Sequence, residues 1–417
     1  MPRLPTHSFL VPVLGIVLGL FLATGSVLAE EAVRPEVGKP LQAAESLIKQ
    51  QKYPDALAKL RVAQSVGDLT PYETSLIDQL RGIAAAASGD HQTAAHAFEA
   101  VLAYGHQPGA ARLAMIQAVI GQYYQLADYP KVVSWVKHYR SEGGTASETL
   151  ALLPQAYYLA NDFANAAQSL RDMIKDEEHL GRVPTESQLQ VLANSSLKLN
   201  DRAGYNAALE RLAASYPKPE YWVPLLQAVT ARAGFADRLA LDGDRLALAT
   251  GVLTTAPRYV EFAERALQAE LPGEAKVVLE RGFSAGILGG GADGERHRRL
   301  RTLATARAAE DLPTLTTTER EAAALKDGNG LVNTGLAWLG FGDAAKAADL
   351  IGRGIAKGGL KRPDEAQLHL GIARRAAGQK DQAIKAFQAV QGGDAADLAR
   401  LWELHARAPN AGSGTGR

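Results

Sequence analysis

A run of glycines at residues 286–294 stands directly before a charged cluster, Glu295 to Arg299. Successive glycine amides at the start of a helix can bind an anion, and the basic residues would add positive charge, so this pattern could hold a phosphate. However, GxxxxGK[ST] does not occur, and no β-strand pattern precedes the loop to give GxGxxG its βαβ context. We therefore interpret the run as a flexible loop between helices. If it binds anything, an acidic partner segment suits it better than a nucleotide.

The other residue types that could do chemistry are scattered along the chain. Among the nine histidines, His91 and His96 are five positions apart, which places them on different helix faces rather than together as metal ligands. HExxH and GxSxG are absent, and no Ser/His/Asp set has a spacing that implies convergence. The chain has no cysteine, which excludes thiolate catalysis, disulfides, Cys-ligated metal and a lipoprotein anchor. We expect no catalytic residue, metal or cofactor.

An internal repeat sets the elements that any binding surface must use. With Asp364 as position 1, Gly371 falls at position 8, Ala383 at 20 and Phe387 at 24. This is the residue order of the tetratricopeptide repeat (TPR), in which small residues let two antiparallel helices cross closely and a large one fills the space beside them. The same spacing recurs from starts near residues 37, 75, 113, 147, 186, 256 and 328. Units near 221 and 292 would keep the phase without the signature.

The repeat predicts an all-α fold, a TPR-type α-solenoid that forms a right-handed superhelix of about ten helical hairpins. A helix in the second degenerate unit should break near Pro313. The expected segments are 37–220 with five TPR units, 221–255 as a degenerate helical pair, 256–291 as a TPR unit, 292–327 as a degenerate helical unit after the glycine-rich loop, 328–408 with two TPR units, and 409–417 as a disordered tail.

The first helix of each TPR unit lines the concave surface, so the repeat also predicts groove residues. In the units at 113, 147 and 186 the inward positions hold Gln117, Tyr124, Gln155, Tyr158, Gln190 and Asn194. Amides and tyrosines suit the main chain of an extended segment, although ordinary exposed polar residues are the alternative interpretation. The Lys and Asn pair that grips a peptide's terminal carboxylate is missing, because Gln190 stands where the lysine should be.

The first 29 residues have the features of a secretory signal: Arg3, an apolar stretch from Phe9 to Ala23, and a small-x-small site that ends at Ala29. An uncleaved membrane anchor over residues 9–28 is the alternative. Lys plus Arg (45) equals Asp plus Glu (45), so no global field favours nucleic acid. We expect a periplasmic protein with no stable membrane insertion after cleavage.

Seven segments carry a more specific resemblance: KPLQAA (39–44), QAYYL (155–159), GILG (286–289), ERH (295–297), GGLKRPD (358–364), LHLGIA (368–373) and DLARLW (397–402). With them the chain resembles a family of exported proteobacterial TPR proteins, encoded near TonB, ExbB and ExbD and commonly assigned to the TonB system. The resemblance implies a non-enzymatic scaffold or adaptor for protein partners, with TonB-system components among them. A cell-envelope factor that binds peptide or peptidoglycan is the alternative.

Overall fold

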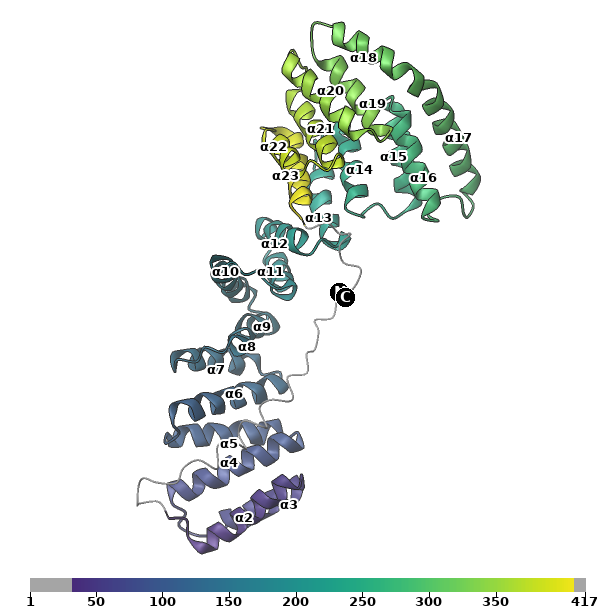
Figure 1. Cartoon of the computed structure of the whole chain (residues 1–417). Helices are drawn as coiled ribbons and strands as arrows, with labels where there is room; N and C mark the ends of the chain where they lie inside the picture. The colour runs from purple at the N-terminus through teal and green to yellow at the C-terminus, as the bar shows by residue number, and fades with distance from the viewer. Residues whose placement is uncertain (1–31, 409–417) are drawn as a thin grey trace. The chain divides into compact units, whose positions relative to one another are not determined.

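The computed structural model describes residues 32–408, and every regular element in this range is helical (Figure 1). The predicted all-α class is therefore confirmed. The predicted signal peptide (1–29) and the predicted tail (409–417) lie outside the described residues. The chain divides into two compact units, residues 1–202 (unit 1) and 203–417 (unit 2). No helix in the described range is both long enough and apolar enough to cross a membrane.

Unit 1 is a stack of antiparallel helices in which each helix packs on its neighbours in the sequence. Buried side chains are in continuous contact from Val37 on the first helix to Ala156 on α9. This local pattern of contacts is the one expected for stacked hairpins. The helices are α2 (Pro35–Lys49), α3 (Tyr53–Gln64), α4 (Pro71–Ser88), α5 (His91–Tyr104), α6 (Gly109–Gln125), α7 (Tyr129–Ser141), α8 (Ser147–Leu150), α9 (Leu152–Leu159), α10 (Phe163–His179) and α11 (Glu186–Lys198).

The turn inside a hairpin has a recurring structure. Asn161 follows α9 with a positive φ of 61°, and Asp162 then caps α10 by accepting a hydrogen bond from the backbone N–H of Asn165 at 3.2 Å. Such a cap satisfies one of the free N–H groups at the start of a helix. The same cap occurs at Asp90, Asp128 and, in unit 2, Asp343.

The first hairpin of unit 1 is tied to the second by an arginine and a buried glutamate. Arg34, just before α2, donates from Nη2 to Oε2 of Glu73 at 2.7 Å and from its backbone N–H to Oε1 at 3.0 Å. Glu73 also accepts from the backbone N–H of Thr70, which closes a capping box on α4. The Arg34 side chain, followed by the Thr70 amide, lowers the pKa of Glu73 to about 2.

Unit 2 is also built from helical hairpins, but its ends meet. Its elements are α12 (Arg202–Ser215), α13 (Pro219–Thr230), η2 (Asp237–Leu239), α14 (Ala240–Ala249), α15 (Ala256–Gln268), α16 (Pro272–Ser284), α17 (Gly294–Asp311), η3 (Leu312–Thr314), α18 (Leu315–Ala324), α19 (Asn329–Gly340), α20 (Ala344–Lys357), α21 (Pro363–Ala376), α22 (Lys380–Gln388) and α23 (Gly393–Arg407). Besides its neighbours in sequence, α13 and α14 contact α23, and α16 contacts α19. The helices of unit 2 therefore form a closed circuit, which we call the ring.

Long-range polar contacts hold the ring closed. Arg232 after α13 pairs with Asp394 and Asp397 at 2.5 and 2.9 Å, and the backbone N–H of Ala236 donates to Asp394 at 2.8 Å. The indole of Trp222 on α13 lies edge-on to the ring of His405 on α23, with centroids 5.9 Å apart. The segment 221–255, predicted as a degenerate pair within an array, thus packs against α23.

The second degenerate unit lies on the outside of the ring. In Figure 1, α17 and α18 form the outer edge of unit 2, while α16 packs directly on α19. The approach of α19 to α16 is close, since a β-carbon on Gly340 would lie 2.9 Å from the backbone nitrogen of Glu274. The expected break near Pro313 is present: α17 ends at Asp311 and η3 separates it from α18. Proline at this place removes an N–H donor that a continuous helix would need.

Candidate binding site

The six predicted groove residues of unit 1 are all half-buried. Gln155 on α9 donates from Nε2 to the hydroxyl of Tyr124 on α6 at 2.8 Å. Gln117, also on α6, donates to the hydroxyl of Thr149 on α8 at 2.7 Å. These hydrogen bonds join successive hairpins, so much of the polar capacity of these side chains is used within the stack.

The other three predicted residues lie farther along unit 1. The ring of Tyr158 on α9 packs edge-on against Phe163, with centroids 5.4 Å apart. Gln190 and Asn194 lie one turn apart on α11 and therefore share a face of that helix. The structure brings Tyr124 and Gln155 into direct contact. Binding of a partner at these six residues stays a prediction.

A second candidate, which the sequence did not indicate, is a cavity of about 700 Å³ inside unit 2. This size is within the range of ligand-binding pockets in proteins. Helices α14, α18, α19 and α21 supply most of the walls, together with η2, the turn before α16 and the last residue of α17. Helices α14 and α21 are far apart in the sequence, and closure of the ring brings them together. The cavity therefore depends on this closure.

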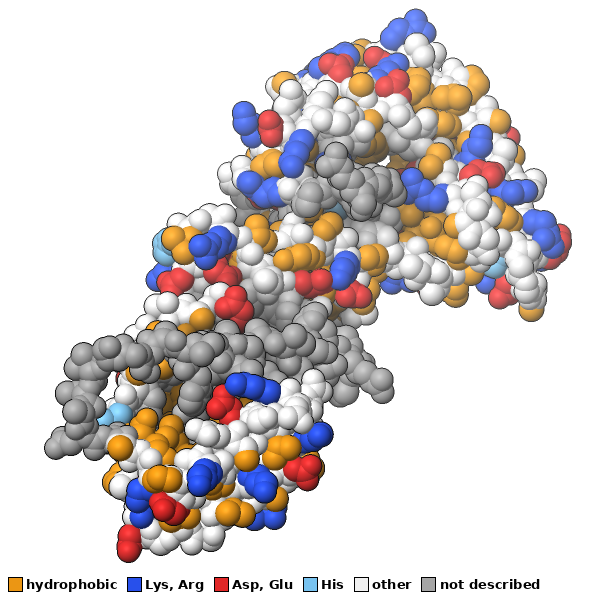
Figure 2. Space-filling model, turned by 60° about the horizontal axis from the view of Figure 1, so that its bottom comes forward, with side chains coloured by type: hydrophobic (Ala, Val, Ile, Leu, Met, Phe, Trp, Pro, Cys, Tyr) orange, Lys and Arg blue, Asp and Glu red, His pale blue; other side chains and the backbone are white. Residues whose placement is uncertain are grey.

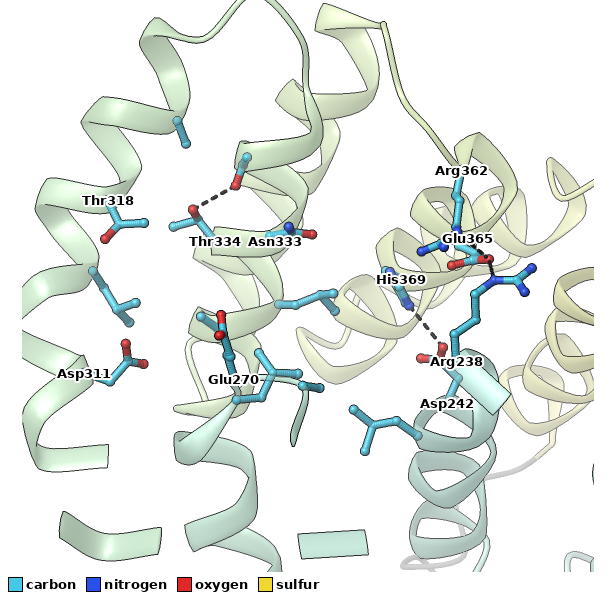
Figure 3. A pocket seen from close by; sticks show the side chains of 18 of the residues that line it. Arg238, Asp242, Glu270, Asp311, Thr318, Asn333, Thr334, Arg362, Glu365 and His369 are labelled. Atoms are coloured by element: carbon cyan, nitrogen blue, oxygen red, sulfur yellow. Dashed lines mark hydrogen bonds and ion pairs between the residues drawn. The ribbon is translucent and has the colours of Figure 1, made fainter. Parts of the chain in front are cut away.

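One wall of the cavity contains a buried charge network, of which Figure 3 shows the pair Asp242 and His369. Arg245 on α14 is 7% exposed and donates to Oδ1 of Asp242 at 2.6 Å and to both carboxylate oxygens of Glu274 at 2.7 Å. His369 on α21 approaches the other oxygen of Asp242, with Nε2 3.1 Å from Oδ2. Buried charges must be paired in this way because removal from water is costly.

The environment of Asp242 keeps it ionised. Burial alone would raise the pKa of Asp242, but its interactions with His369 and then with Arg245 outweigh burial and lower the pKa to about 2. A charge-assisted network of this kind fixes the relative positions of α14, α16 and α21, since α14 supplies Asp242 and Arg245, α16 supplies Glu274 and α21 supplies His369. The other imidazole nitrogen, Nδ1 of His369, is buried and has no hydrogen-bond partner.

A second group of charges on the same wall comes from the start of α21 and from η2. Arg238 donates from Nε to Glu365 at 2.5 Å, and Arg362 lies 3.7 Å from the same carboxylate. In Figure 3 these three side chains gather beside His369 and Asp242. The single carboxylate of Glu365 thus balances part of the charge of two guanidinium groups.

The opposite wall is acidic and partly apolar. In Figure 3, Glu270 and Asp311 lie across the cavity from Asp242 and His369, with Asn333 and Thr334 on α19 between the two walls. Burial, followed by the nearby Glu270 carboxylate, raises the pKa of Asp311. The acidic and arginine side chains of the lining are three arginines and five carboxylates, which together give a net charge of −2: Arg238, Arg245, Arg362, Asp242, Glu270, Asp311, Glu321 and Glu365.

Sequence reasoning missed this cavity, although one signal was available. Asp242, Asp244 and Arg245 stand within an otherwise apolar stretch of α14, and all three are buried. Charged residues in the middle of an apolar helix indicate buried ion pairs. Their partners, however, lie on α15, α16 and α21, and no repeat spacing predicts which helices meet there.

The glycine-rich loop that the sequence singled out is held by contacts within the protein. The backbone N–H of Gly289 donates to Nδ1 of buried His297 at 3.3 Å, and the carbonyl of Gly289 accepts from Arg298 at 3.1 Å. Arg296 pairs with Glu264 at 3.1 Å. Several of the charges that suggested an anion site are therefore paired internally. Over the visible face of the molecule, basic and acidic side chains are interspersed (Figure 2).

Comparisons with known proteins agree with the repeat. The family profile of the tetratricopeptide repeat matches residues 365–392, which include α22 and most of α21. A comparison with curated protein sequences gives no significant match.

Similar solved structures are distant. They include a tetratricopeptide-repeat protein from Parabacteroides merdae (11% identity, TM-score 0.32, covering 82% of this chain and 99% of that one). Others are a chain of the Cut9–Hcn1 hetero-tetramer of the APC/C (11%, TM-score 0.25, 78% and 66%) and yeast Tom70 (11%, TM-score 0.23, 89% and 94%). TM-scores this low give no information on how the hairpins of this chain are arranged.

Proposed function

We propose that this tetratricopeptide-repeat protein is a non-enzymatic scaffold and that the cavity in unit 2 binds a segment of a protein partner. The observation that carries the proposal is the closure of the ring, which leaves an open cavity of about 700 Å³ between charged and apolar walls. Stacked helical hairpins commonly present such concave surfaces to extended partners. The walls contain hydrogen-bonding groups in several orientations, including Asn333 and Thr334, which suits a peptide main chain.

We further propose that the protein works in the periplasm, after removal of residues 1–29, and takes part in TonB–ExbB–ExbD-dependent transport. The support is the sequence pattern of the first 29 residues and the seven segments that resemble the exported family. Export is tested by expressing the full chain in its natural host and sequencing the N-terminus of the purified product. A product that begins at Glu30 agrees with the proposal, and one that begins at Met1 contradicts signal cleavage.

The choice of partner is tested by recovery from the cell envelope. Tagged full-length protein is incubated with a detergent extract of the envelope, and the bound proteins are identified by mass spectrometry. Recovery of TonB, ExbB or ExbD in preference to a tagged control protein is the expected result. Binding to purified peptidoglycan or muropeptides, with no protein recovered, would instead favour the alternative of a peptidoglycan-binding factor.

A further inference from the structure

The acidic wall of the cavity contains three carboxylates that the protein itself does not neutralise. Glu270 lies in the turn before α16, Asp311 ends α17 and Glu321 is on α18. Within residues 32–408, no side-chain hydrogen bond or ion pair joins these carboxylates to another residue. Asp311 is the clearest case, because its Oδ2 atom is buried and has no partner. Glu270 and Glu321 are exposed and Asp311 is half-buried, so the cost of an unpaired carboxylate falls mainly on the buried Oδ2 atom of Asp311. A cation that enters the cavity would relieve that cost.

Apolar side chains from three elements line the same cavity. Leu271 precedes α16, Leu315 begins α18 and Leu336 lies on α19. A carboxylate cluster next to leucines matches the two parts of a lysine or arginine side chain, whose methylene stem is apolar and whose head is charged. The arginines on the opposite wall already have partners: Arg238 and Arg362 pair with Glu365, and Arg245 pairs with Asp242 and Glu274. They therefore do not neutralise the acidic wall.

We propose that the cavity of unit 2 binds a lysine or arginine side chain of a partner segment, with its charged head against Glu270, Asp311 and Glu321. This inference rests on the proposed function and adds the chemical class of the segment. The cavity has more room than one side chain fills, so residues that flank the basic one also contact the walls. A neutral or acidic side chain would leave the carboxylates unpaired or place like charges together, and both are unfavourable.

The test is fluorescence anisotropy with labelled, acetylated peptides of twelve residues and the full-length protein. One peptide has lysines at its central positions, a second has arginines, and a third has norleucine, which keeps the methylene stem without the charge. We expect the two basic peptides to bind at least tenfold more tightly than the norleucine peptide, and their affinity to fall as salt is raised. Equal affinity for the norleucine peptide would overturn the proposal.

Substitutions of the cavity carboxylates test where the lysine peptide binds. Glu270→Gln with Asp311→Asn should weaken binding of the lysine peptide at least tenfold, and Glu321→Gln is tested as a separate variant. The matched control is Asp349→Asn on α20, which removes an exposed carboxylate that does not line the cavity. Melting curves confirm that each variant is folded. Unchanged affinity in both cavity variants, or an equal loss in the control, would overturn the assignment.

A small free amine could occupy the cavity in the same way as a lysine side chain. Competition by cadaverine is therefore measured in a separate experiment. Cadaverine that competes as well as the lysine peptide would contradict a peptide ligand. The outcome also separates this inference from the proposed function. If envelope proteins are recovered equally by wild type and by the cavity variants, the scaffold role stands and the basic-side-chain site is wrong. If no protein is recovered at all, the scaffold role itself fails.

Discussion

His369 and Asp242 are 127 positions apart in the sequence, and Nε2 of the histidine lies 3.1 Å from Oδ2 of the aspartate. This contact joins α21 to α14 and forms part of the wall of the cavity in unit 2. Arg245 completes the network by pairing with Asp242 and Glu274. The same residues therefore close the ring and shape the site.

Replacing Arg245 tests how much the buried network contributes to stability. Arg245→Met keeps an apolar stem but leaves the carboxylates of Asp242 and Glu274 without their cation. We expect a loss of about 3–5 kcal/mol in the free energy of unfolding, because breaking a buried pair leaves uncompensated charge. Urea unfolding followed by circular dichroism measures it. Arg353→Met, at an exposed pair on α20, is the control and should change stability by less than about 0.5 kcal/mol. An equal loss of unfolding free energy in the two variants would show that the buried network contributes little to stability.

A substitution in the hairpin of α21 and α22 tests the packing between repeat positions 8 and 24. A β-carbon on Gly371 would lie 2.3 Å from Cε1 of Phe387, so Gly371→Leu should overpack the crossing and cost about 1–3 kcal/mol. Gly352→Ala on α20 is a matched control, since nothing lies within 4 Å of a β-carbon there. That variant should stabilise the protein by about 0.5–1 kcal/mol because alanine favours the helix. Thermal melting compares both. A Gly371→Leu protein that melts like wild type would contradict the packing described for this hairpin.

The pair Arg34–Glu73 makes the stability of unit 1 depend on pH. The folded pKa of Glu73 is about 2, below its ordinary value of 4.5, so its ionised form stabilises the folded state above pH 4.5. That contribution is lost as the pH falls from 4.5 through 2. We expect Glu73→Gln to melt below wild type at pH 7 and the difference to shrink across this range. Scanning calorimetry at several pH values measures it, and a difference that is independent of pH would contradict the assignment.

Removing the hydroxyl groups of two tyrosines in unit 1 tests which of them stabilises the stack of hairpins. Tyr124→Phe removes the hydroxyl that accepts from Gln155 and should cost about 0.5–1.5 kcal/mol of stability. Tyr158→Phe is the matched control on α9, where the described contact is between rings, and it should change stability by less than about 0.5 kcal/mol. Chemical unfolding measures both. If Tyr158→Phe were the more destabilising of the two, the hydrogen bond would not be the important contact.

The hairpins could be predicted from the sequence because their contacts are local. Gly371 and Phe387 are sixteen positions apart, and their contact requires only two helices and a turn. The same is true of Gly82 with Phe98 and Gly335 with Ile351, where a β-carbon on the glycine would lie 2.4 and 2.6 Å from the larger side chain. Small and large residues at these two positions are a direct requirement of close helix packing.

The ring could not be predicted, because its closure depends on contacts that no repeat specifies. Arg232 with Asp394 and Arg238 with Glu365 join segments more than a hundred positions apart. Their residue types are ordinary for an exposed helix, and only the curvature of the hairpin stack brings them together. Likewise, the repeat spacing predicts that Tyr124 and Gln155 line a groove, but it does not predict the hydrogen bond between them. Spacing within a hairpin predicts the helix face on which a residue lies, but not which residue of a neighbouring hairpin it contacts.

Site-specific photo-crosslinking in the natural host tests the central claim most directly. A benzoylphenylalanine replaces Asn333, which lines the cavity and is exposed, or Asp349, which is exposed on α20 outside it. We predict a covalent adduct with a partner protein from position 333 and none from position 349, and peptide mapping should place a lysine or arginine beside the crosslink. Adducts from position 349 alone, or none from position 333 in cells that carry the partner, would contradict a binding site in the cavity of unit 2.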